Sequence, residues 1–515
     1  GPVVVTATAG TPGPTSYATV KEAFDAINAG THQGSITIAI IGDTTEAASA
    51  VLNESGSGSA SYTAISIQPS GGAARTVTGN IAGHLIDLNG ADNVSINGLN
   101  TGGNSLTISN TSQQVTASTI RFVNDATNNT VTNSTVSGST GAALSSGFGV
   151  IYFATGTVTG NDGNIISNNN ITGAGGAQPI NGIYSFGTSA AIDNSGITVS
   201  GNNISDYFNA NSSSNGINAN TGNSAWTITN NKFFQTGART YLTAATHNGI
   251  NVLSGSGYTI TGNTIGYAAA NGTGVYTMGG TVATRFVAIN LAVGTTATTS
   301  VQGNSVASIS LTGIGTNSGS GSLAGVSVTS GNVNIGNVTP NNFGSTSGTG
   351  SLTTTPTTTT AAAIIGVNSA TTGTIVISNN TFGAFTSASP TAANPGAVFG
   401  VNVSAIAASI TVTGNTFGNS TAENMRAGVL GTTTGSSIAG AIIQTAIPSV
   451  FNYSNNTIRN FSSYGTGTGG YVRGIQTNTS SSATATGTIN NNTITNLITS
   501  GAVSGQSSAN TSAQG

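Results

Sequence analysis

Ile166-Ser-Asn-Asn-Asn-Ile171 and Ile260-Thr-Gly-Asn-Thr-Ile265 are two copies of the hexad that decides the fold: apolar, polar, Asn or Gly, Asn, any residue, apolar. Asparagine and glycine accept the left-handed backbone conformation of tight turns, so each hexad predicts two short strands joined by a turn. The fourth position marks each copy. The markers are Asn169, Asn202, Asn231, Asn263, Asn304, Asn380, Asn415, Asn456 and Asn492.

The hexads recur with a period of roughly three dozen residues. Markers Asn202 and Asn231 are 29 residues apart, whereas Asn263 and Asn304 are 41 apart. One gap of 76 residues spans two periods, with a degenerate copy at residues 341–342. These unequal gaps favour a constant frame of strands that carries loops of different lengths.

A second signature, Gly followed by an alternating strand as in Gly182-Ile-Tyr-Ser-Phe186, precedes most hexads. Each period therefore supplies three short strands and shows no helical periodicity. This pattern predicts an all-β fold, a right-handed parallel β-helix (solenoid) with a short N-terminal capping helix. Strands of successive coils would lie about 4.8 Å apart and pair with one another.

The pattern divides the chain into three segments. Residues 1–84 form an N-terminal cap with a helix at 19–29 and the first strands. Residues 85–497 form a parallel β-helix of about 11–12 coils. Residues 498–515 are a flexible or assembly-related tail, rich in Ser, Gly, Ala and Gln.

We interpret the marker asparagines as a structural ladder, in which each amide pairs with the same amide one coil away. The alternative is that they act as ligands in a binding groove. Many Asn-x-Ser/Thr triplets also occur, but they follow from the composition and are a weak indication of glycosylation.

The capping helix is predicted by Thr19 and Glu22, which are spaced as a capping box. Phe24 and Ile27 lie on its apolar face, and Gly30 ends it. Such a helix would cover the apolar end of the first coil, as terminal caps do in repeat proteins.

The C-terminal segment has no comparable cover, so its last strand edges are open to pairing. We expect either that the native chain continues beyond Gly515 or that this end meets another molecule. Gly1-Pro2 is either what remains after removal of a signal peptide or an expression scar.

Charge is almost absent: nine Lys and Arg and twelve Asp and Glu make up 4% of the chain. No basic surface exists to hold nucleic acid by counterion release. No run of 18 apolar residues predicts a membrane span. The chain has no Cys, which agrees with a secreted protein stabilised by repetition. A surface without charge lacks the usual protection against association, so copies of the chain are expected partners, end-to-end or laterally.

Catalytic groups are scarce. Between residues 207 and 515 the only carboxylate is Glu423, which argues against a carboxylate pair there. The three histidines share no repeat position, so a histidine metal site is not expected. Four aspartates precede strands in successive periods. They are Asp92, Asp125, Asp162 and Asp193.

We interpret these four aspartates as Asx turns. Two alternatives stay open: stacked carboxylates that bind Ca²⁺, or a catalytic site with a raised carboxyl pKa. A lyase would also need a basic residue, and only Arg121 lies near them in sequence. We assign no catalytic residue and no cofactor, with Ca²⁺ as the one alternative.

The N-terminal region resembles a known family. The runs Ser16–Gly30, Gly34–Gly42, Ile86–Gly98 and Ile120–Asn129 are similar to the start of large secreted β-strand-repeat proteins of Gram-negative bacteria, which the type IX system typically exports. The resemblance is close over about the first 200 residues and general beyond them. It implies a pectate-lyase-like β-helix at the cell surface without implying lyase activity. Such proteins typically carry a C-terminal sorting domain; we do not expect one within these 515 residues, so we expect truncation, maturation or a separate chain.

We therefore expect a secreted, extracellular structural or adhesive protein that associates into a surface filament or sheath or acts as an adhesin. The alternative is a carbohydrate-binding or polysaccharide-degrading protein that uses the 85–206 region and contacts surface polysaccharide; a polysaccharide lyase or hydrolase is the enzymatic form of that alternative.

Overall fold

Each hexad folds as a strand, a left-handed turn residue and a second strand. In the first hexad quoted above, the flanking Ile166 and Ile171 are fully buried. The third residue, Asn168, has a φ of 54°, and its counterpart Gly262 has a φ of 64°. The fourth-position asparagine follows this residue with its side chain buried. The third residue therefore changes the direction of the chain, and the side-chain amide of the fourth residue points into the interior.

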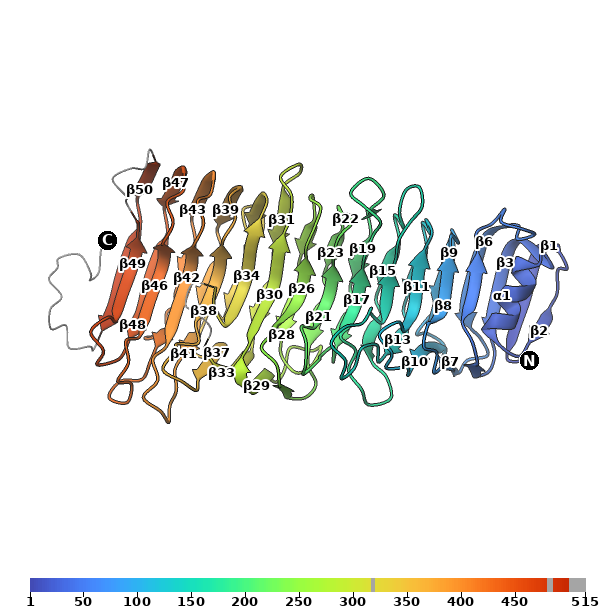
Figure 1. The fold of residues 1–515 in the computed structure, drawn as a ribbon, viewed down its shortest axis with the longest axis horizontal. Coiled ribbons are helices and arrows are strands. Elements are labelled where there is room, and N and C mark those ends of the chain that lie inside the picture. Colours follow the sequence, from blue (N-terminus) through green and yellow to red (C-terminus); the bar gives the residue numbers. More distant parts are fainter. Residues whose placement is uncertain (316–319, 479–484, 500–515) are drawn as a thin grey trace. The chain divides into compact units, whose positions relative to one another are not determined.

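The strands build a right-handed parallel β-helix, which confirms the predicted fold class. The computed structural model describes residues 1–315, 320–478 and 485–499. The chain forms two units: unit 1 comprises Gly1–Phe233 and Leu253–Tyr258, and unit 2 comprises Phe234–Val252 and Thr259–Gly515. In both units each coil contributes strands to three sheets, which we call A, B and C (Figure 1). Strand β24 (Lys232–Phe234) lies at the boundary.

In unit 1, sheet A consists of β1 (Val3–Gly10), β2 (Thr15–Tyr17), β3 (His32–Ile40), β6 (Tyr62–Pro69), β9 (Val94–Asn97), β12 (Thr130–Thr132), β15 (Ile165–Ser167), β19 (Thr198–Ser200) and β23 (Thr227–Thr229). Sheet B consists of β4 (Thr44–Glu46), β7 (Ala74–Gly79), β10 (Ser105–Asn110), β13 (Thr135–Gly138), β16 (Asn170–Gly173) and β20 (Asn203–Ser205). Sheet C consists of β5 (Ala50–Asn53), β8 (His84–Asn89), β11 (Ser118–Val123), β14 (Ile151–Phe153), β17 (Asn181–Ser185) and β21 (Asn215–Ala219). A short pair is made by β18 (Asn194–Ser195) and β22 (Asn223–Ser224).

In unit 2, sheet A consists of β27 (Thr259–Thr261), β31 (Thr299–Gln302), β35 (Val333–Ile335), β39 (Thr374–Ser378), β43 (Ser409–Thr413), β47 (Val450–Ser454) and β50 (Thr486–Asn490). Sheet C consists of β26 (Thr246–Val252), β30 (Arg285–Ala292), β34 (Leu323–Ser330), β38 (Ile364–Ser369), β42 (Ala397–Val403), β46 (Ile438–Gln444) and β49 (Tyr471–Gln476).

Sheet B of unit 2 has two rows of strands. The first row is β28 (Thr264–Gly266), β32 (Ser305–Ala307), β36 (Asn342–Gly344), β40 (Thr381–Gly383), β44 (Thr416–Phe417), β48 (Thr457–Ser463) and β51 (Thr493–Thr499). The second row is β25 (Arg239–Tyr241), β29 (Tyr276–Ala283), β33 (Ile309–Ile314), β37 (Leu352–Pro356), β41 (Phe385–Ser387) and β45 (Met425–Ala427). The tail predicted at 498–515 lies outside the described residues from residue 500 onward.

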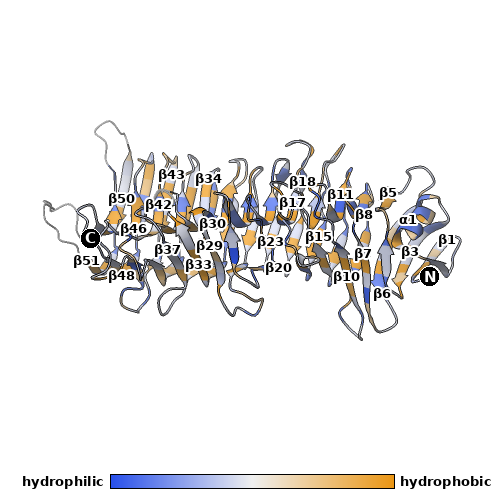
Figure 2. Cartoon of the chain, turned by 60° about the horizontal axis from the view of Figure 1, so that its bottom comes forward, coloured by the Kyte–Doolittle hydropathy of each residue, from blue (hydrophilic) through white to orange (hydrophobic). Residues whose placement is uncertain are grey.

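The core of each unit is a set of columns of identical or similar side chains, one from each coil. In unit 2, Phe343, Phe382 and Phe417 stack with ring centroids 5.0 and 4.7 Å apart. In unit 1, Phe122 and Phe153 stack at 4.6 Å. Apolar and polar residues are interspersed along the strands, as Figure 2 shows in orange and blue. The alternation is what a strand with one buried face requires.

Helix α1 (Val20–Asn28) forms at the predicted place, between Thr19 and Ala29. Phe24 and Ile27 are fully buried. The Thr19 hydroxyl accepts a hydrogen bond from the Glu22 amide at 3.1 Å, as a capping box predicts. The Glu22 carboxylate accepts from the amide of Ala18 rather than from that of Thr19.

A second carboxylate, which the sequence analysis did not identify, also caps this helix. Glu46 on β4 is only 2% exposed and accepts hydrogen bonds from the amides of Val20 and Lys21 at 2.9 and 3.0 Å. Its carboxylate also accepts from the Thr44 hydroxyl at 3.0 Å. A carboxylate at a helix N-terminus satisfies free amides and interacts favourably with the helix dipole. Glu46 thus joins the cap to the first coil.

The marker asparagines form buried ladders within each unit. In unit 1, the Oδ1 of Asn202 accepts hydrogen bonds from both the backbone amide and the Nδ2 of Asn169, at 2.9 and 3.1 Å. Asn202 donates in the same way to Asn231. In unit 2 the ladder runs through Asn263, Asn304, Asn341, Asn380, Asn415, Asn456 and Asn492. It includes Asn341 of the degenerate copy.

Replacing a ladder residue should destabilise unit 2 strongly. Asn380→Ala removes the acceptor of the Asn341 backbone amide and the donor to the carbonyl of Ile335, so buried polar groups lose their partners. We expect the free energy of unfolding to fall by about 2–4 kcal/mol, measured by urea denaturation.

The control is the exposed neighbour Asn379, whose φ of 62° suits glycine. Asn379→Gly should change stability by no more than about 0.5 kcal/mol. Equal unfolding midpoints for the Asn380→Ala variant and the wild type would contradict a structural role for the ladder.

Candidate functional site

The outer face of sheet C in unit 1 carries one column of chemically distinctive side chains. Asp87, Arg121, Tyr152 and Tyr184 occupy the same register position on β8, β11, β14 and β17. Figure 1 labels β8, β11 and β17 of this sheet, and β14 lies between β11 and β17. Successive side chains of a strand point to opposite faces, so these four point away from the core that their neighbours, such as Phe122, fill.

Asp87 and Arg121 form a bidentate ion pair. The Nε and Nη2 atoms of Arg121 donate to the two carboxylate oxygens of Asp87 at 2.9 and 2.7 Å. The Arg121 side chain is 26% exposed, whereas that of Asp87 is 7% exposed. Arg121 is therefore the more exposed partner of the pair, and the buried carboxylate of Asp87 compensates its positive charge.

An aromatic cluster adjoins this pair. The ring of Phe148 stacks on that of Tyr152, with centroids 4.2 Å apart and an angle of 13° between the planes. Tyr184 lies 5.6 Å from Tyr152 and 6.0 Å from Phe148. Tyr152 is buried against Val123 and Ala154, while Phe148 and Tyr184 are partly exposed. Burial raises the pKa of the Tyr152 phenol to about 12, so it stays protonated at neutral pH.

Phe148 belongs to a loop that the rest of unit 1 holds in place. Its carbonyl accepts a hydrogen bond from Nδ2 of Asn181 at 2.9 Å, and its amide donates to the carbonyl of Val115 at 3.2 Å. Earlier in the same loop, the carbonyl of Gly141 accepts a hydrogen bond from Nδ2 of Asn209 at 2.8 Å. These bonds position the ring without any strand pairing at residue 148.

His84 borders the cluster. Its ring centroid lies 6.2 Å from that of Phe148 and 6.0 Å from that of Tyr152. Its Nδ1 is 2.7 Å from the hydroxyl of Ser118. Burial lowers the pKa of His84 to about 4, and the charge of Arg121 acts in the same direction while Asp87 opposes it. The imidazole is therefore neutral at neutral pH.

We call this group the sheet C patch. It comprises His84, Asp87, Arg121, Phe148, Tyr152 and Tyr184. Exposed ring surface next to a compensated guanidinium offers apolar contact and hydrogen-bond donors together. The sequence pointed to Arg121 as a basic residue near the aspartates but did not show that these six residues lie together. The repeated Gly-Ile-Tyr and Val-Ile-Tyr segments before Tyr184 and Tyr152 were the available signal.

The four predicted aspartates have a different use, because each binds donors of the following coil. Asp92 accepts from the amide and hydroxyl of Thr127 at 2.7 and 2.8 Å. Asp162 accepts from the amide and hydroxyl of Ser195 at 2.8 and 3.0 Å. Asp193 accepts from the hydroxyl of Ser224 on β22.

Asp125 accepts the most hydrogen bonds of the four. The amides of Thr157, Val158, Thr159 and Gly160 all donate to its carboxylate, at distances of 2.8–3.2 Å, and the Thr157 hydroxyl donates as well. Burial acts to raise the pKa of Asp125, but these hydrogen bonds outweigh it and lower the pKa to about 2. The Asp125 carboxylate therefore stabilises the loop at residues 157–160 through hydrogen bonds to its amides.

The neighbouring Asp162 behaves in the opposite way. Burial raises its pKa, the bonds from Ser195 oppose the rise, and the charges of Asp193 and Asp125 add to it. Within residues 1–315, 320–478 and 485–499, no group of three or more His, Cys, Asp or Glu side chains is placed to hold a metal ion. The described part of the chain also contains no helix with the length and apolar character needed to cross a membrane.

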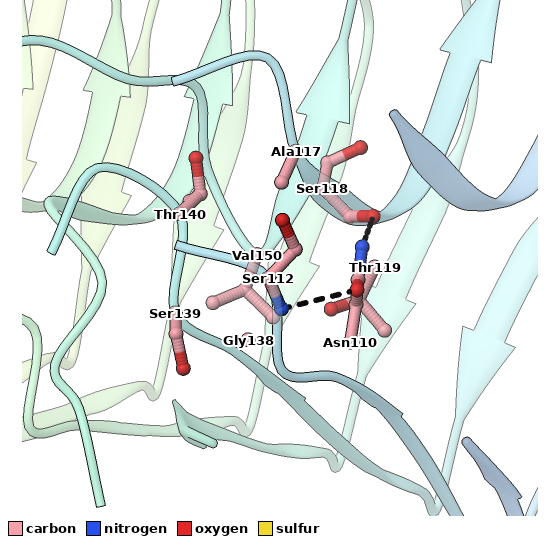
Figure 3. A pocket seen from close by; sticks show the side chains of 9 residues that line it. All are labelled: Asn110, Ser112, Ala117, Ser118, Thr119, Gly138, Ser139, Thr140 and Val150. Carbon is pink, nitrogen blue, oxygen red and sulfur yellow. Dashed lines mark hydrogen bonds between the residues drawn. The ribbon is translucent and has the colours of Figure 1, made fainter. Parts of the chain in front are cut away.

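A small polar pocket lies beside β11 and is lined in part by Asn110, Ser118 and Thr140 (Figure 3). Its empty volume is about 120 Å³ including open solvent, and it has no space for a water molecule. Nδ2 of Asn110 crosses it to donate to the carbonyl of Ser118 at 2.9 Å. The pocket is therefore a packed turn rather than a ligand site.

No protein-family model matches the chain, and no match was found among the curated proteins.

Removing the Asp125 carboxylate should expose its structural role. Because its folded-state pKa lies below the ordinary 3.8, the stability it contributes is present above about pH 4 and is lost as the pH falls toward 2. Asp125→Asn should lower the free energy of unfolding at pH 7 by about 1 kcal/mol, a value reduced for solvent screening. Urea denaturation at pH 7 and near pH 2 would measure both effects.

The difference between this variant and the wild type should become much smaller as the pH falls through about 2. Asp25→Asn is the control, because Asp25 forms only an exposed ion pair with Lys21 and should change stability little. A loss at pH 7 that persists unchanged near pH 2 would contradict the assignment.

Proposed function

We propose that this chain is a secreted structural and adhesive protein that acts at the cell surface. The observation that supports this most is how its few ionised groups are used. Asp92, Asp125, Asp162 and Asp193 accept hydrogen bonds from the next coil, and Glu46 caps α1. These carboxylates maintain the fold, and the surface they leave is dominated by hydroxyls and amides.

The resemblance of the first 200 or so residues to secreted β-strand-repeat proteins supports an extracellular location and export by the type IX route. It also supports grouping the chain with pectate-lyase-like β-helices at the level of architecture. The fold itself carries no activity with it.

Self-association is the structural part of the proposal. An exterior with 4% charged residues offers little electrostatic repulsion between copies. At the N-terminal end of unit 1, α1 and the antiparallel strand β2 cover the first coil. Pairing through that end is therefore disfavoured, and lateral contact between polar faces is the mode we favour.

Light scattering of the purified chain over a range of concentrations tests this part. We expect the apparent mass to rise with concentration and to change little between low and high salt, because few charges are involved. Electron microscopy of the same samples would show the assemblies. A mass equal to 50.1 kDa at every concentration would remove self-association and leave adhesion alone.

A second candidate is a carbohydrate-binding or polysaccharide-degrading protein that uses the 85–206 region. The sheet C patch favours binding, since partly exposed Phe148 and Tyr184 lie beside Tyr152, which pairs in register with Arg121. Incubation with acidic and neutral polysaccharides, followed by measurement of unsaturated and reducing ends, separates the two forms. We expect no new ends. New ends that vanish when Asp92, Asp125 and Asp162 are replaced together would make the chain an enzyme.

A further inference from the structure

We propose that the sheet C patch of unit 1 binds a neutral saccharide and supplies the recognition step of the adhesive function. The inference deepens the proposed function and rests on it. Its basis is the juxtaposition of partly exposed aromatic rings, a charge-compensated guanidinium and a histidine on one face of sheet C.

The aromatic rings provide the apolar surface that a sugar requires. A sugar ring presents C–H groups on its faces and hydroxyls at its edge, so it suits a site with an apolar body beside polar groups. Phe148 and Tyr184 are partly exposed, and the ring of the buried Tyr152 stacks against that of Phe148 with centroids 4.2 Å apart. The cluster is held by packing before any ligand arrives, which reduces the entropy lost on binding.

Hydrogen-bond donors border the rings. A guanidinium has five N–H donors, and Arg121 uses its Nε and one Nη2 hydrogen on Asp87. Three donors remain, on a side chain that is 26% exposed. His84 has its Nδ1 engaged with Ser118, which leaves Nε2 for a ligand hydroxyl. These groups match hydroxyls, which both donate and accept.

The charge of the patch selects a neutral ligand. Arg121 is paired with Asp87, the imidazole of His84 is neutral at neutral pH, and both phenols are protonated. The six residues therefore carry no net charge. A carboxylate or sulfate on the ligand would lose hydration here without gaining an uncompensated cation, which disfavours acidic saccharides.

The size of the patch indicates a short stretch of chain rather than one sugar. Arg121 and Tyr184 lie two coils apart in the same register. At about 4.8 Å for each coil this is roughly 10 Å, the scale of two linked sugar rings. A chain lying across the strands would contact the guanidinium at one end and Tyr184 at the other.

The test is affinity electrophoresis of the full chain in gels that contain neutral glucans, mannans or xylans, or the acidic polygalacturonate or alginate. We expect at least one neutral polymer to retard the protein and neither acidic polymer to do so. Tyr184→Ala should weaken retardation by about tenfold or more, whereas Tyr184→Phe should stay within about threefold of the wild type.

Phe186 provides the matched control. It is 40% exposed and follows β17, but it lies outside the patch, so Phe186→Ala should bind as the wild type does. Arg121→Lys keeps the charge and removes the bidentate fork, and it should also weaken binding. Circular dichroism of each variant checks that the fold is intact.

Three results would overturn the inference: retardation by acidic polymers alone, no retardation by any polymer, or equal retardation of the wild type and Tyr184→Ala. Light scattering of the Tyr184→Ala protein separates this inference from the proposed function. If assembly persists while no neutral polymer binds the wild type, only the saccharide inference fails. If the wild type binds a neutral polymer but never assembles, only the self-association fails.

Discussion

Hydrogen bonding from coil to coil is the constraint on which the rest of the structure depends. A strand two to nine residues long cannot satisfy its own amides and carbonyls, so each coil needs its copy on either side. At the turns the backbone has no strand partner, and a buried asparagine takes that place. Asn304, for example, donates to Asn341 and to the carbonyl of Ile260. The ladder thus extends the pairing of the sheets through the bends.

The same constraint explains the use of charge. Loops that leave the sheets between coils bring amides and hydroxyls to positions without a strand partner, and a carboxylate from the previous coil satisfies several of them at once. Asp125 does this for the loop that begins at Thr157. At the first turn of α1 the carboxylate is Glu46, which comes later in the chain than the helix. In the outer column of sheet C, Asp87 binds Arg121 instead. A saccharide-binding patch can therefore form without adding net charge to the surface.

The repeat frame could be predicted from the sequence because its signals are local. The hexads carry turn and core residues within six positions, and the capping box lies within four. The sheet C patch could not be predicted, because it depends on register between residues such as Arg121 and Tyr152, which are far apart in the chain and separated by loops of irregular length. For the same reason, the sequence indicated Asx turns, with stacked carboxylates as the alternative, and did not show that Asp92 and Asp162 bind Thr127 and Ser195 of the next coil. The third and fourth hexad positions also divide tasks that the sequence analysis gave to one residue.

The asparagine ladder has a direction. Within each unit, every ladder residue before the last donates its backbone amide to the asparagine of the coil that comes later in the chain, as Asn169 does to Asn202 and Asn415 does to Asn456. A newly formed coil therefore has an unpaired asparagine amide until the asparagine of the next coil accepts from it. Helix α1 covers the N-terminal end of the stack. Because the N-terminal coils are synthesised first, such a stack can grow vectorially, each turn templating its successor.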